Sequence, residues 1–387
     1  MANEADLTTV VIDTGSGWVK AGRPGAVPKL VFRNVIGRRA DGTGVPVVGD
    51  EAWRRRGEFT LSFPVEHGAV ADWDGIAIVW WHVFERLGLS PEDCQVLLTQ
   101  APASPASARE NTVRVMFDAL GAARVYLAST SALVLHEAGV LTGTVLELGH
   151  EVCTAAPVDQ GYTFEGAVTR LDASGQQVTE RLAELLGARP DFPAGAVEDP
   201  DVMQKTKEDR CEVTDSAECL RCDGPECEPR SPYTLPDGTG VTIGSERWCA
   251  PEGLFAPEQF GFPDGMPGIH EITHAAIMDC EDVTLRRYLY ANIVLAGGTS
   301  LIPGLPERLR AEIARLAPDD LKRSVRVLQA GPHAAWHGGA MLAQTMQDTQ
   351  WITIQRYEVS GPSIARWTCA FPESHASGAL RLLNRPE

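Results

Sequence analysis

The N-terminal part of the chain alternates short apolar runs with glycine-rich turns. Residues 10–12 and 18–22 are mostly apolar and flank a turn with the sequence Gly15-Ser16-Gly17. This pattern predicts a tight hairpin between two buried strands. Further along, residues 73–87 carry apolar side chains with a helical repeat, at Ile76, Val79, Trp80, Val83, Phe84 and Leu87. That stripe predicts a helix with one face toward the core.

The same reading extends over the rest of the chain. Helices are expected at residues 104–120 (capped by Ser104 or Ser107), 131–138, 176–186, 205–210, 305–316 and 336–346, strands at 125–127, 144–148, 294–296 and 324–327, and loops at 36–48 and 188–200. A strand-rich start followed by alternating helices and strands occurs twice. We therefore expect two related α/β domains with a ligand between them.

Composition narrows the class of protein. A chain of 387 residues exceeds one ordinary core, and 44% hydrophobic with 22% charged residues is typical of a soluble globular protein. The net charge of −18 disfavours nucleic acid and anionic membranes as partners, although it is equally explained by solubility. No apolar run is long enough to span a bilayer, and the N-terminus lacks a leader pattern, so we expect a cytoplasmic protein.

The first turn carries candidate chemistry. Gly15 and Gly17 allow positive φ, so that successive backbone N–H groups can converge on one anion. Asp13 is placed to hold a metal ion through water, and Lys20 could meet a phosphate. An ordinary glycine hairpin is the alternative, because such short motifs often match by chance.

Further motifs occur in the order in which the actin family has them. They are Val31-Phe32 to Gly37-Arg38, Val48-Gly49-Asp50-Glu51-Ala52, Phe63-Pro64-Val65-Glu66-His67-Gly68, Leu97-Leu98-Thr99-Gln100-Ala101-Pro102, Leu235-Pro236-Asp237-Gly238, Gly268-Ile269-His270-Glu271, Leu289-Tyr290-Ala291-Asn292, Gly297-Gly298-Thr299, Pro303-Gly304 and Ser360-Gly361-Pro362-Ser363-Ile364. With the first turn, they make the chain resemble actin and the actin-related proteins of eukaryotic type over nearly its whole length. The alanine-, glycine- and arginine-rich composition hints at a bacterial member.

The resemblance implies an actin-like ATPase fold, in which two duplicated ribonuclease-H-like domains enclose a nucleotide cleft. The outer domain would comprise residues 1–137 and 334–387, with a small subdomain at about 34–63. The inner domain would comprise residues 138–333, with a small subdomain at about 174–258. Hinges are expected near Glu137-Ala138 and Gly331-Pro332.

The resemblance also implies ATP or ADP with Mg²⁺ as cofactors. Asp13 and Glu147 would hold Mg²⁺ through water. The nucleotide would be bound by Asp13, Thr14, Gly15, Ser16, Gly17, Lys20, Gly149, Lys207, Glu208, Gly297, Gly298 and Thr299. Lys207 and Glu208 match the pair that touches ribose and adenine in actin.

The catalytic positions depart from the family pattern. Glu147-Leu148-Gly149-His150-Glu151 stands where actin has Asp-Ser-Gly-Asp-Gly, Thr130 replaces the glutamine that orients water, and Thr154 replaces a nearby histidine. Ile302 replaces the tyrosine that stacks on adenine. Because phosphoryl transfer depends on positioning, we expect at most a slow ATPase, with Glu147, Thr130 and Thr154 as diverged catalytic positions.

Nine cysteines, an odd number, fit reduced thiols better than a disulfide framework. Cys211, Cys219, Cys222 and Cys227 could supply the four thiolates of a structural zinc site. Only one pair has Cys-x-x-Cys spacing, so a local disulfide or unliganded thiols are favoured over zinc.

Two functions fit these observations best. The first is a cytoskeletal protein that self-associates into nucleotide-dependent filaments; the second is a non-polymerising actin-related subunit that binds ATP structurally within a protein complex. The tip loop at residues 40–46 is short, which changes the usual contact along a filament. The segment at residues 259–267 keeps two phenylalanines and would contact a partner if exposed, or fold onto its own domain.

A sugar-kinase-like enzyme is disfavoured because no insertion is present to bind a sugar. The tail at residues 372–387 is expected to be flexible or to dock through its leucines.

Overall fold

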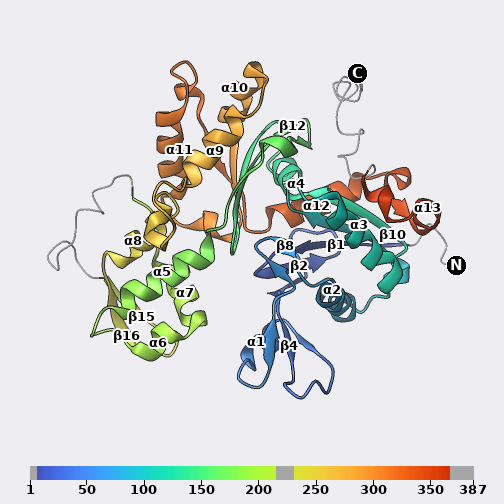
Figure 1. The fold of residues 1–387 in the computed structure, drawn as a ribbon, viewed down its shortest axis with the longest axis horizontal. Coiled ribbons are helices and arrows are strands. Elements are labelled where there is room, and N and C mark those ends of the chain that lie inside the picture. Colours follow the sequence, from blue (N-terminus) through green and yellow to red (C-terminus); the bar gives the residue numbers. More distant parts are fainter. Residues whose placement is uncertain (1–6, 215–230, 367–387) are drawn as a thin grey trace. The chain divides into compact units, whose positions relative to one another are not determined.

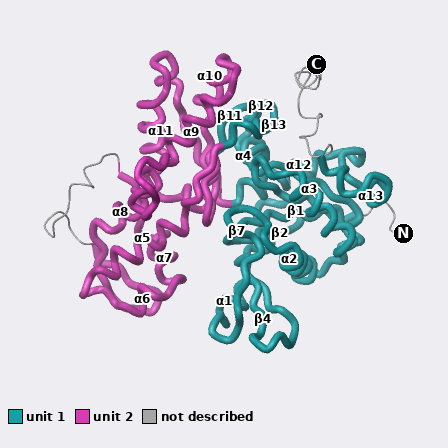
Figure 2. The backbone as a smooth tube through the Cα atoms, in the orientation of Figure 1, with its two compact units in different colours: residues 1–145, 156–168, 333–387 teal, residues 146–155, 169–332 magenta. Residues whose placement is uncertain are grey.

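The computed structural model describes residues 7–214 and 231–366 (Figure 1). The chain divides into two compact units (Figure 2). Unit 1 comprises residues 1–145, 156–168 and 333–387, and unit 2 comprises residues 146–155 and 169–332. The tail at residues 372–387 and three of the four clustered cysteines, Cys219, Cys222 and Cys227, lie outside the described residues.

Unit 1 is built on a six-stranded sheet with the strand order β19-β10-β9-β1-β2-β3. Its strands are β1 (Thr8–Thr14), β2 (Trp18–Gly22), β3 (Leu30–Arg33), β9 (Cys94–Gln100), β10 (Arg124–Ser129) and β19 (Ile352–Thr353). Strands β1, β9 and β10 run parallel, whereas β1, β2 and β3 form an antiparallel meander. The first predicted hairpin is therefore confirmed as β1 and β2.

Both faces of this sheet are buried, and β1 shows how its residues divide between them. Val10 and Ile12 belong to one apolar cluster, and Val11, between them, belongs to the other. This is the two-residue period of a strand. Unit 1 includes the helices α2 (Trp73–Leu87), α3 (Ala106–Arg114), α4 (Thr130–Glu137), α12 (Ala334–Thr345) and α13 (Ile354–Ser360).

Helix α2 has the bounds that its apolar stripe predicts. Asp72 caps its first turn by accepting a hydrogen bond from Gly75 N, and Gly88 ends it in the left-handed conformation, with φ 66°. Ile76, Val79, Trp80, Val83 and Phe84 are all buried in the cluster that contains Val10 and Ile12. Burial of such side chains stabilises the fold by roughly 1.5–3 kcal/mol each.

Helix α12 packs closely on α4 at the other cluster. A Cβ atom at Gly338 would lie 1.9 Å from the carbonyl oxygen of Leu133, so only glycine permits this approach. Trp336 is fully buried and donates a hydrogen bond from Nε1 to the Val11 carbonyl oxygen, at 3.0 Å. These contacts fix α12 against the centre of the sheet.

A small subdomain follows β3. It contains β4 (Ile36–Arg38), β5 (Val47–Val48), β6 (Thr60–Ser62) and α1 (Asp50–Arg54), and β7 (Val65–Glu66) pairs with β8 (Ala69–Val70) next to it. The Arg33 guanidinium lies 4.8 Å from the ring centroid of Trp18 and 4.7 Å from that of Trp53. This cation–π sandwich ties the main sheet to the segment around α1.

The second sheet has the order β13-β12-β11-β17-β18, with β14 paired to β12. Its strands are β11 (Gly143–Leu148), β12 (Cys153–Asp159), β13 (Tyr162–Thr163), β14 (Thr169–Leu171), β17 (Ile293–Ala296) and β18 (Val327–Gln329). The boundaries between the units at 145/146 and 155/156 fall within β11 and β12. Helices α9 (Ile269–Met278), α10 (Val283–Ala291) and α11 (Leu305–Leu316) belong to unit 2, and α11 has its predicted bounds.

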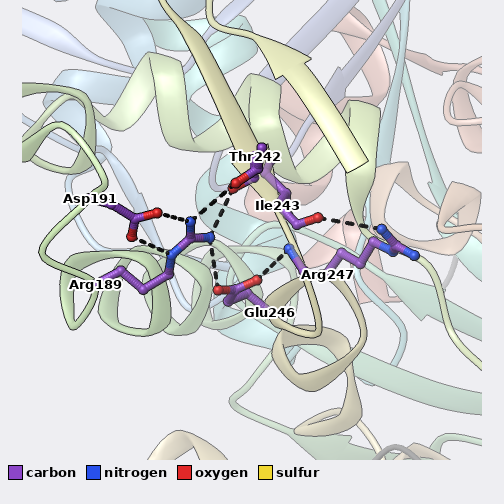
Figure 3. A network of polar contacts seen from close by, with 7 residues as sticks. Arg189, Asp191, Thr242, Ile243, Glu246 and Arg247 are labelled. Carbon is purple, nitrogen blue, oxygen red and sulfur yellow. Dashed lines mark hydrogen bonds and ion pairs between the residues drawn. The ribbon is translucent and has the colours of Figure 1, made fainter. Parts of the chain in front are cut away.

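Unit 2 also contains helices α5 (Gly175–Gly187), α6 (Ala194–Glu198), α7 (Pro200–Arg210) and α8 (Glu246–Glu252), and the hairpin β15 (Ser231–Thr234) with β16 (Gly240–Ile243). Arg189, which follows α5, joins β16 to α8 (Figure 3). Its Nη1 donates to the Thr242 carbonyl oxygen at 2.8 Å and to Glu246 Oε1 at 3.0 Å, and its Nη2 pairs with Asp191 at 2.8 Å. The Arg189 and Glu246 side chains are only 12% and 14% exposed, so this pair is largely shielded from water.

Replacing Arg189 with methionine should destabilise unit 2 by about 2 kcal/mol, because Glu246 and the Thr242 carbonyl lose a charged donor in a site that is largely shielded from water. Urea unfolding and amide hydrogen exchange of residues 231–243 would measure this. Asp191→Asn is the matched control and should change stability by less than about 0.5 kcal/mol, since the Asp191 side chain is half exposed. Equal stability of the two variants would contradict the expected role of Arg189.

Several local predictions were wrong. Residues 194–198 form the short helix α6 within the predicted loop at 188–200, and β4 and β5 border a shorter loop within 36–48. The strand expected at 324–327 begins only at Val327. Neither serine caps α3: Pro105 occupies the cap position, and Ser104 donates instead to the Ala101 carbonyl oxygen. Short elements depend on tertiary pairing, which local sequence does not encode.

Candidate functional site

The turn between β1 and β2 closes tightly. Gly15 N donates to the Trp18 carbonyl oxygen at 3.0 Å, and the strands pair Asp13 with Lys20 directly across the hairpin. In the described part of the chain, the backbone N–H groups of Ser16 and Gly17 have no hydrogen-bond acceptor. Ser16 is only 8% exposed. Two adjacent unsatisfied donors in a tight turn suit an anion.

Asp13 is a buried carboxylate, 7% exposed, with two partners in unit 1. Its Oδ2 accepts from Lys20 Nζ at 2.8 Å, and its Oδ1 accepts from Thr99 Oγ1 at 2.7 Å. These bonds offset the desolvation of the carboxylate and fix its orientation. The neighbouring Thr14 is held differently: its Oγ1 accepts from Trp80 Nε1 at 3.0 Å, which secures the strand to α2.

Asn34 donates two hydrogen bonds to the turn between β1 and β2. Its side-chain Nδ2 donates to the Gly15 carbonyl oxygen at 2.9 Å, and its backbone N donates to the Gly17 carbonyl oxygen at 3.0 Å. Asn34 is 1% exposed. These two bonds hold the carbonyl groups of Gly15 and Gly17 toward Asn34.

Replacing Asn34 with alanine should destabilise the protein by about 1–2 kcal/mol, since the Gly15 carbonyl would lose its buried donor. It should also weaken nucleotide binding several-fold, because the turn would no longer be fixed. Thermal unfolding and titration with a fluorescent ATP analogue would test both effects. Asn111→Ala, on α3, is the control and should leave binding unchanged; loss of binding in both variants would show that the effect is not local.

A second turn, between β11 and β12, repeats the geometry of the first. Gly149 N donates to the Val152 carbonyl oxygen at 3.0 Å, as Gly15 does to Trp18. A Cβ atom would lie 3.2 Å from that oxygen at Gly149 and 3.3 Å from its counterpart at Gly15. Glu147 is half-buried in β11, two residues before this glycine.

Several polar groups of unit 2 converge on this second turn. The Gly149 carbonyl oxygen accepts from Ser174 Oγ at 2.8 Å and from Thr299 Oγ1 at 2.9 Å. Lys207 Nζ donates to the Gly175 carbonyl oxygen at 2.8 Å. A Cβ atom at Gly175 would lie 2.3 Å from Thr299 Oγ1, so a larger residue would separate these groups.

The glycine pair after β17 completes this cluster. Gly297 has φ 88°, and a Cβ atom there would lie 2.3 Å from the Leu148 carbonyl oxygen, so glycine is required. A Cβ atom at Gly298 would meet no atom within 4 Å. Ile302 is buried, with 6% of its surface exposed.

The structure places three other predicted site residues as follows. The Glu208 carboxylate accepts from Gln204 Nε2 at 2.9 Å on the exposed side of α7. Thr130 is the first residue of α4 in unit 1, and Thr154 lies in β12 opposite Arg170 in unit 2.

Sequence reasoning missed Asn34, Thr99, Ser174 and Gly175. Only Ser174 had a local signal, since Ser174-x-x-Gln177 is a capping box and the Gln177 side chain does accept from Ser174 N.

The groups present fit a nucleotide with Mg²⁺. Ser16 and Gly17 offer N–H donors, Lys20 and Lys207 offer positive charge, and Asp13 offers a carboxylate of the kind that Mg²⁺ prefers. Burial lowers the pKa of the Lys207 ammonium, and a nearby anion would offset that desolvation.

Burial raises the pKa of the Cys211 thiol to about 12. Among the described residues, no three His, Cys, Asp or Glu side chains gather as a metal site would require.

No helix within residues 7–214 and 231–366 is long and apolar enough to cross a membrane.

The family model for actin matches residues 4–370 of the 387-residue chain. The mixed α/β architecture, with several sheets, agrees with that match. The repeated glycine turn, the paired Asp13 and Lys20 and this nearly complete match lead to one conclusion: the chain belongs to the actin family.

Proposed function

We propose that this protein binds ATP with Mg²⁺ and that the bound nucleotide controls its assembly into filaments. Actin-family proteins generally bind ATP or ADP with a divalent cation. The observation that carries the proposal is the pair of equivalent turns at Gly15 and Gly149, the first of which lies beside Asp13 and Lys20. Backbone donors, a lysine and a buried carboxylate are the parts that a metal-bound triphosphate needs.

Each group has a role that follows from its chemistry. The N–H groups of Ser16 and Gly17, together with Lys20, bind phosphate oxygens. Asp13, in unit 1, and Glu147, in unit 2, are the carboxylates proposed to hold Mg²⁺ through water. In unit 2, the cluster of Gly149, Lys207, Gly297, Gly298 and Thr299 binds the rest of the nucleotide, where Gly298 leaves room for a flat ring.

Hydrolysis is proposed to be slow. Thr130 and Thr154 are short hydroxyl side chains at positions where the resemblance expects a glutamine and a histidine. A threonine side chain reaches less far toward a water molecule than a glutamine or a histidine does. Small displacements of the attacking water strongly slow phosphoryl transfer. Phosphate release from Mg-ATP should remain close to the uncatalysed background, and Thr130→Gln is the variant expected to raise it.

Assembly is supported by the exposed tip of the small subdomain in unit 1. Val45, in the loop between β4 and β5, is 88% exposed. The segment at residues 259–267 is less exposed. The Phe260 ring lies against Gly253 of its own unit, so closely that a Cβ atom at Gly253 would be 2.3 Å from it. Phe262 and Met266 are likewise only partly exposed. The tip loop is therefore the better candidate for a contact between subunits.

High-speed sedimentation over a range of protein concentrations tests the proposal, with Mg-ATP, with Mg-ADP, with ATP plus EDTA and without nucleotide. A threshold concentration above which the excess pellets only with Mg-ATP would support it. Protein that binds ATP but never pellets would favour the non-polymerising subunit. Val45→Asp should raise the threshold several-fold, whereas Val27→Asp, at a position that is 71% exposed elsewhere on unit 1, should not.

A further inference from the structure

The Thr99 hydroxyl has a single hydrogen-bond partner in the described part of the chain. Its Oγ1 donates to Asp13 Oδ1 at 2.7 Å and makes no other hydrogen bond there. On the opposite side of β9, the register partner of Thr99 is Ala128 of β10, whose methyl side chain offers no polar group. The hydroxyl is therefore used for the Asp13 carboxylate alone.

The parallel pairing of β1 with β9 brings Thr99 to Asp13. Its register matches Ile12 with Leu98, and Asp13 and Thr99 are the next residues of the two strands. Neighbouring strands lie roughly 4.8 Å apart, so a threonine hydroxyl reaches a carboxylate on the adjacent strand directly. Both residues belong to inner strands of the six-stranded sheet, and strands position side chains more precisely than loops do.

The Asp13 carboxylate is held at both of its oxygens. Oδ2 accepts from Lys20 Nζ at 2.8 Å, and Oδ1 accepts from the Thr99 hydroxyl. An ionised carboxylate can accept about four hydrogen bonds, two at each oxygen, so one acceptor position remains on each. These positions suit the water molecules of a hydrated cation.

Mg²⁺ and Ca²⁺ place different demands on such a carboxylate. Mg²⁺ gives up its water reluctantly and requires near-ideal octahedral geometry, whereas Ca²⁺ takes about six to eight oxygen ligands directly and tolerates varied geometry. A carboxylate that is fixed at both oxygens offers accurately placed acceptors for the water of Mg²⁺. One that can rotate is better able to bind Ca²⁺ directly.

We propose that Thr99 is a positioning residue that holds Asp13 for hydrated Mg²⁺ and thereby favours Mg²⁺ over Ca²⁺. This inference rests on the proposed function, because it concerns the metal that accompanies the nucleotide. Without the Thr99 hydroxyl, Asp13 would be held by Lys20 alone, and its Oδ1 could turn toward a directly bound cation. Loss of the hydroxyl should therefore harm Mg²⁺ binding more than Ca²⁺ binding.

Isothermal titration of the full chain with the Mg²⁺ and Ca²⁺ complexes of a slowly hydrolysed ATP analogue tests this inference. In Thr99→Val, the dissociation constant should rise about tenfold for the Mg²⁺ complex and less than about threefold for the Ca²⁺ complex, because a hydrogen bond to a charged acceptor is lost. Thr99→Ser keeps the hydroxyl and should restore the native preference. If Thr99→Val does not fold, Thr99→Ala, which places no methyl group against the carboxylate, should show the same change.

Thr9→Val is the matched control. Thr9 and Gln95 are register partners on the same two strands, and Thr9 Oγ1 accepts from Gln95 Nε2 at 2.8 Å. This variant also loses a side-chain hydrogen bond between β1 and β9, but it leaves Asp13 untouched. Both dissociation constants should stay at their native values.

The inference would be overturned by native affinity for the Mg²⁺ complex in a folded Thr99→Val or Thr99→Ala chain, by equal losses for the two complexes, or by the same change of preference in Thr9→Val. A native chain that binds neither complex would refute the proposed function and this inference with it. Binding by the native chain without any effect of the Thr99 variants would overturn this inference alone.

Discussion

Replacing Lys20 with methionine should lower the affinity for Mg-ATP about 100-fold. Lys20 is the only cation bonded to Asp13 in the described structure, with Nζ 2.8 Å from Oδ2. A charged hydrogen bond contributes roughly 1.5–3 kcal/mol, or about ten- to 150-fold in affinity. The variant also leaves the Asp13 carboxylate buried and without its counter-charge, which would repel phosphate. Both effects act in the same direction.

Isothermal titration with a slowly hydrolysed ATP analogue measures this affinity. Lys322→Met is the matched control. Lys322 is exposed, pairs with the nearby Asp319 and is far from Lys20 in the sequence. Asp13→Asn combined with Lys20→Met should recover stability, since no charge is then left buried, but should not recover Mg-ATP binding. A loss of less than threefold in the single variant would remove Lys20 from the phosphate site.

The largest effect on stability is expected from Arg308→Leu. Arg308 is 6% exposed and its Nη2 lies 3.0 Å from Glu252 Oε1, while its Nε donates to Glu312 at 2.7 Å. Its guanidinium also lies 4.8 Å from the centroid of the Phe255 ring. Removing one partner of a buried ion pair leaves the other charge without compensation. We expect a loss of about 3–5 kcal/mol in the free energy of unfolding at pH 7.

The loss should depend on pH. Burial already raises the pKa of Glu252 above its usual value despite Arg308, and removing Arg308 would raise it further. A carboxyl group whose pKa is higher in the folded state than in the unfolded state favours folding when protonated. Its unfavourable contribution therefore develops as pH rises from the unfolded pKa of about 4.3 through the folded value. The deficit of the variant relative to the native chain should be smaller at pH 5 than at pH 8.

Urea unfolding at both pH values provides the measurement. Glu252→Gln should cost less than Arg308→Leu, because Arg308 would keep Glu312, and the double variant should recover much of the loss. A deficit that does not change between pH 5 and pH 8, or a double variant as unstable as Arg308→Leu, would contradict an unpaired Glu252 as the cause.

Much of the regular structure could be predicted where one long segment buries one face. Helices α2 and α11 begin and end where their apolar stripes predict, because caps and a 3.6-residue period are local properties. The short elements could not be predicted in this way. Helix α6 and strands β4 and β5 have five residues or fewer, so that contacts with distant segments decide whether they form.

The candidate nucleotide site also has a part that could be predicted from local sequence and a part that could not. Asp13, the Gly15 turn and Lys20 lie within eight residues, and a two-stranded hairpin brings Asp13 and Lys20 together by its register alone. Asn34, just after β3, reaches the Gly15 turn from 19 residues away along the chain, and Thr99, in β9, reaches Asp13 from 86 residues away. Ser174, Lys207 and Thr299 likewise meet around Gly149 and Gly175 from separate elements. Such partners carry no local signal.

By itself, the sequence determined the fold class, the family resemblance and the residues of the first glycine turn, because strand alternation, helical stripes and glycine turns depend on residues that are close together in the sequence. The tertiary structure decided which side chains support those turns, that the Glu208 carboxylate bonds to Gln204, and that Arg109 keeps a buried, unsatisfied nitrogen beside a pocket. The physical reason is that burial and hydrogen-bond satisfaction depend on atoms from segments far apart in the chain, which meet only when the sheets and helices pack.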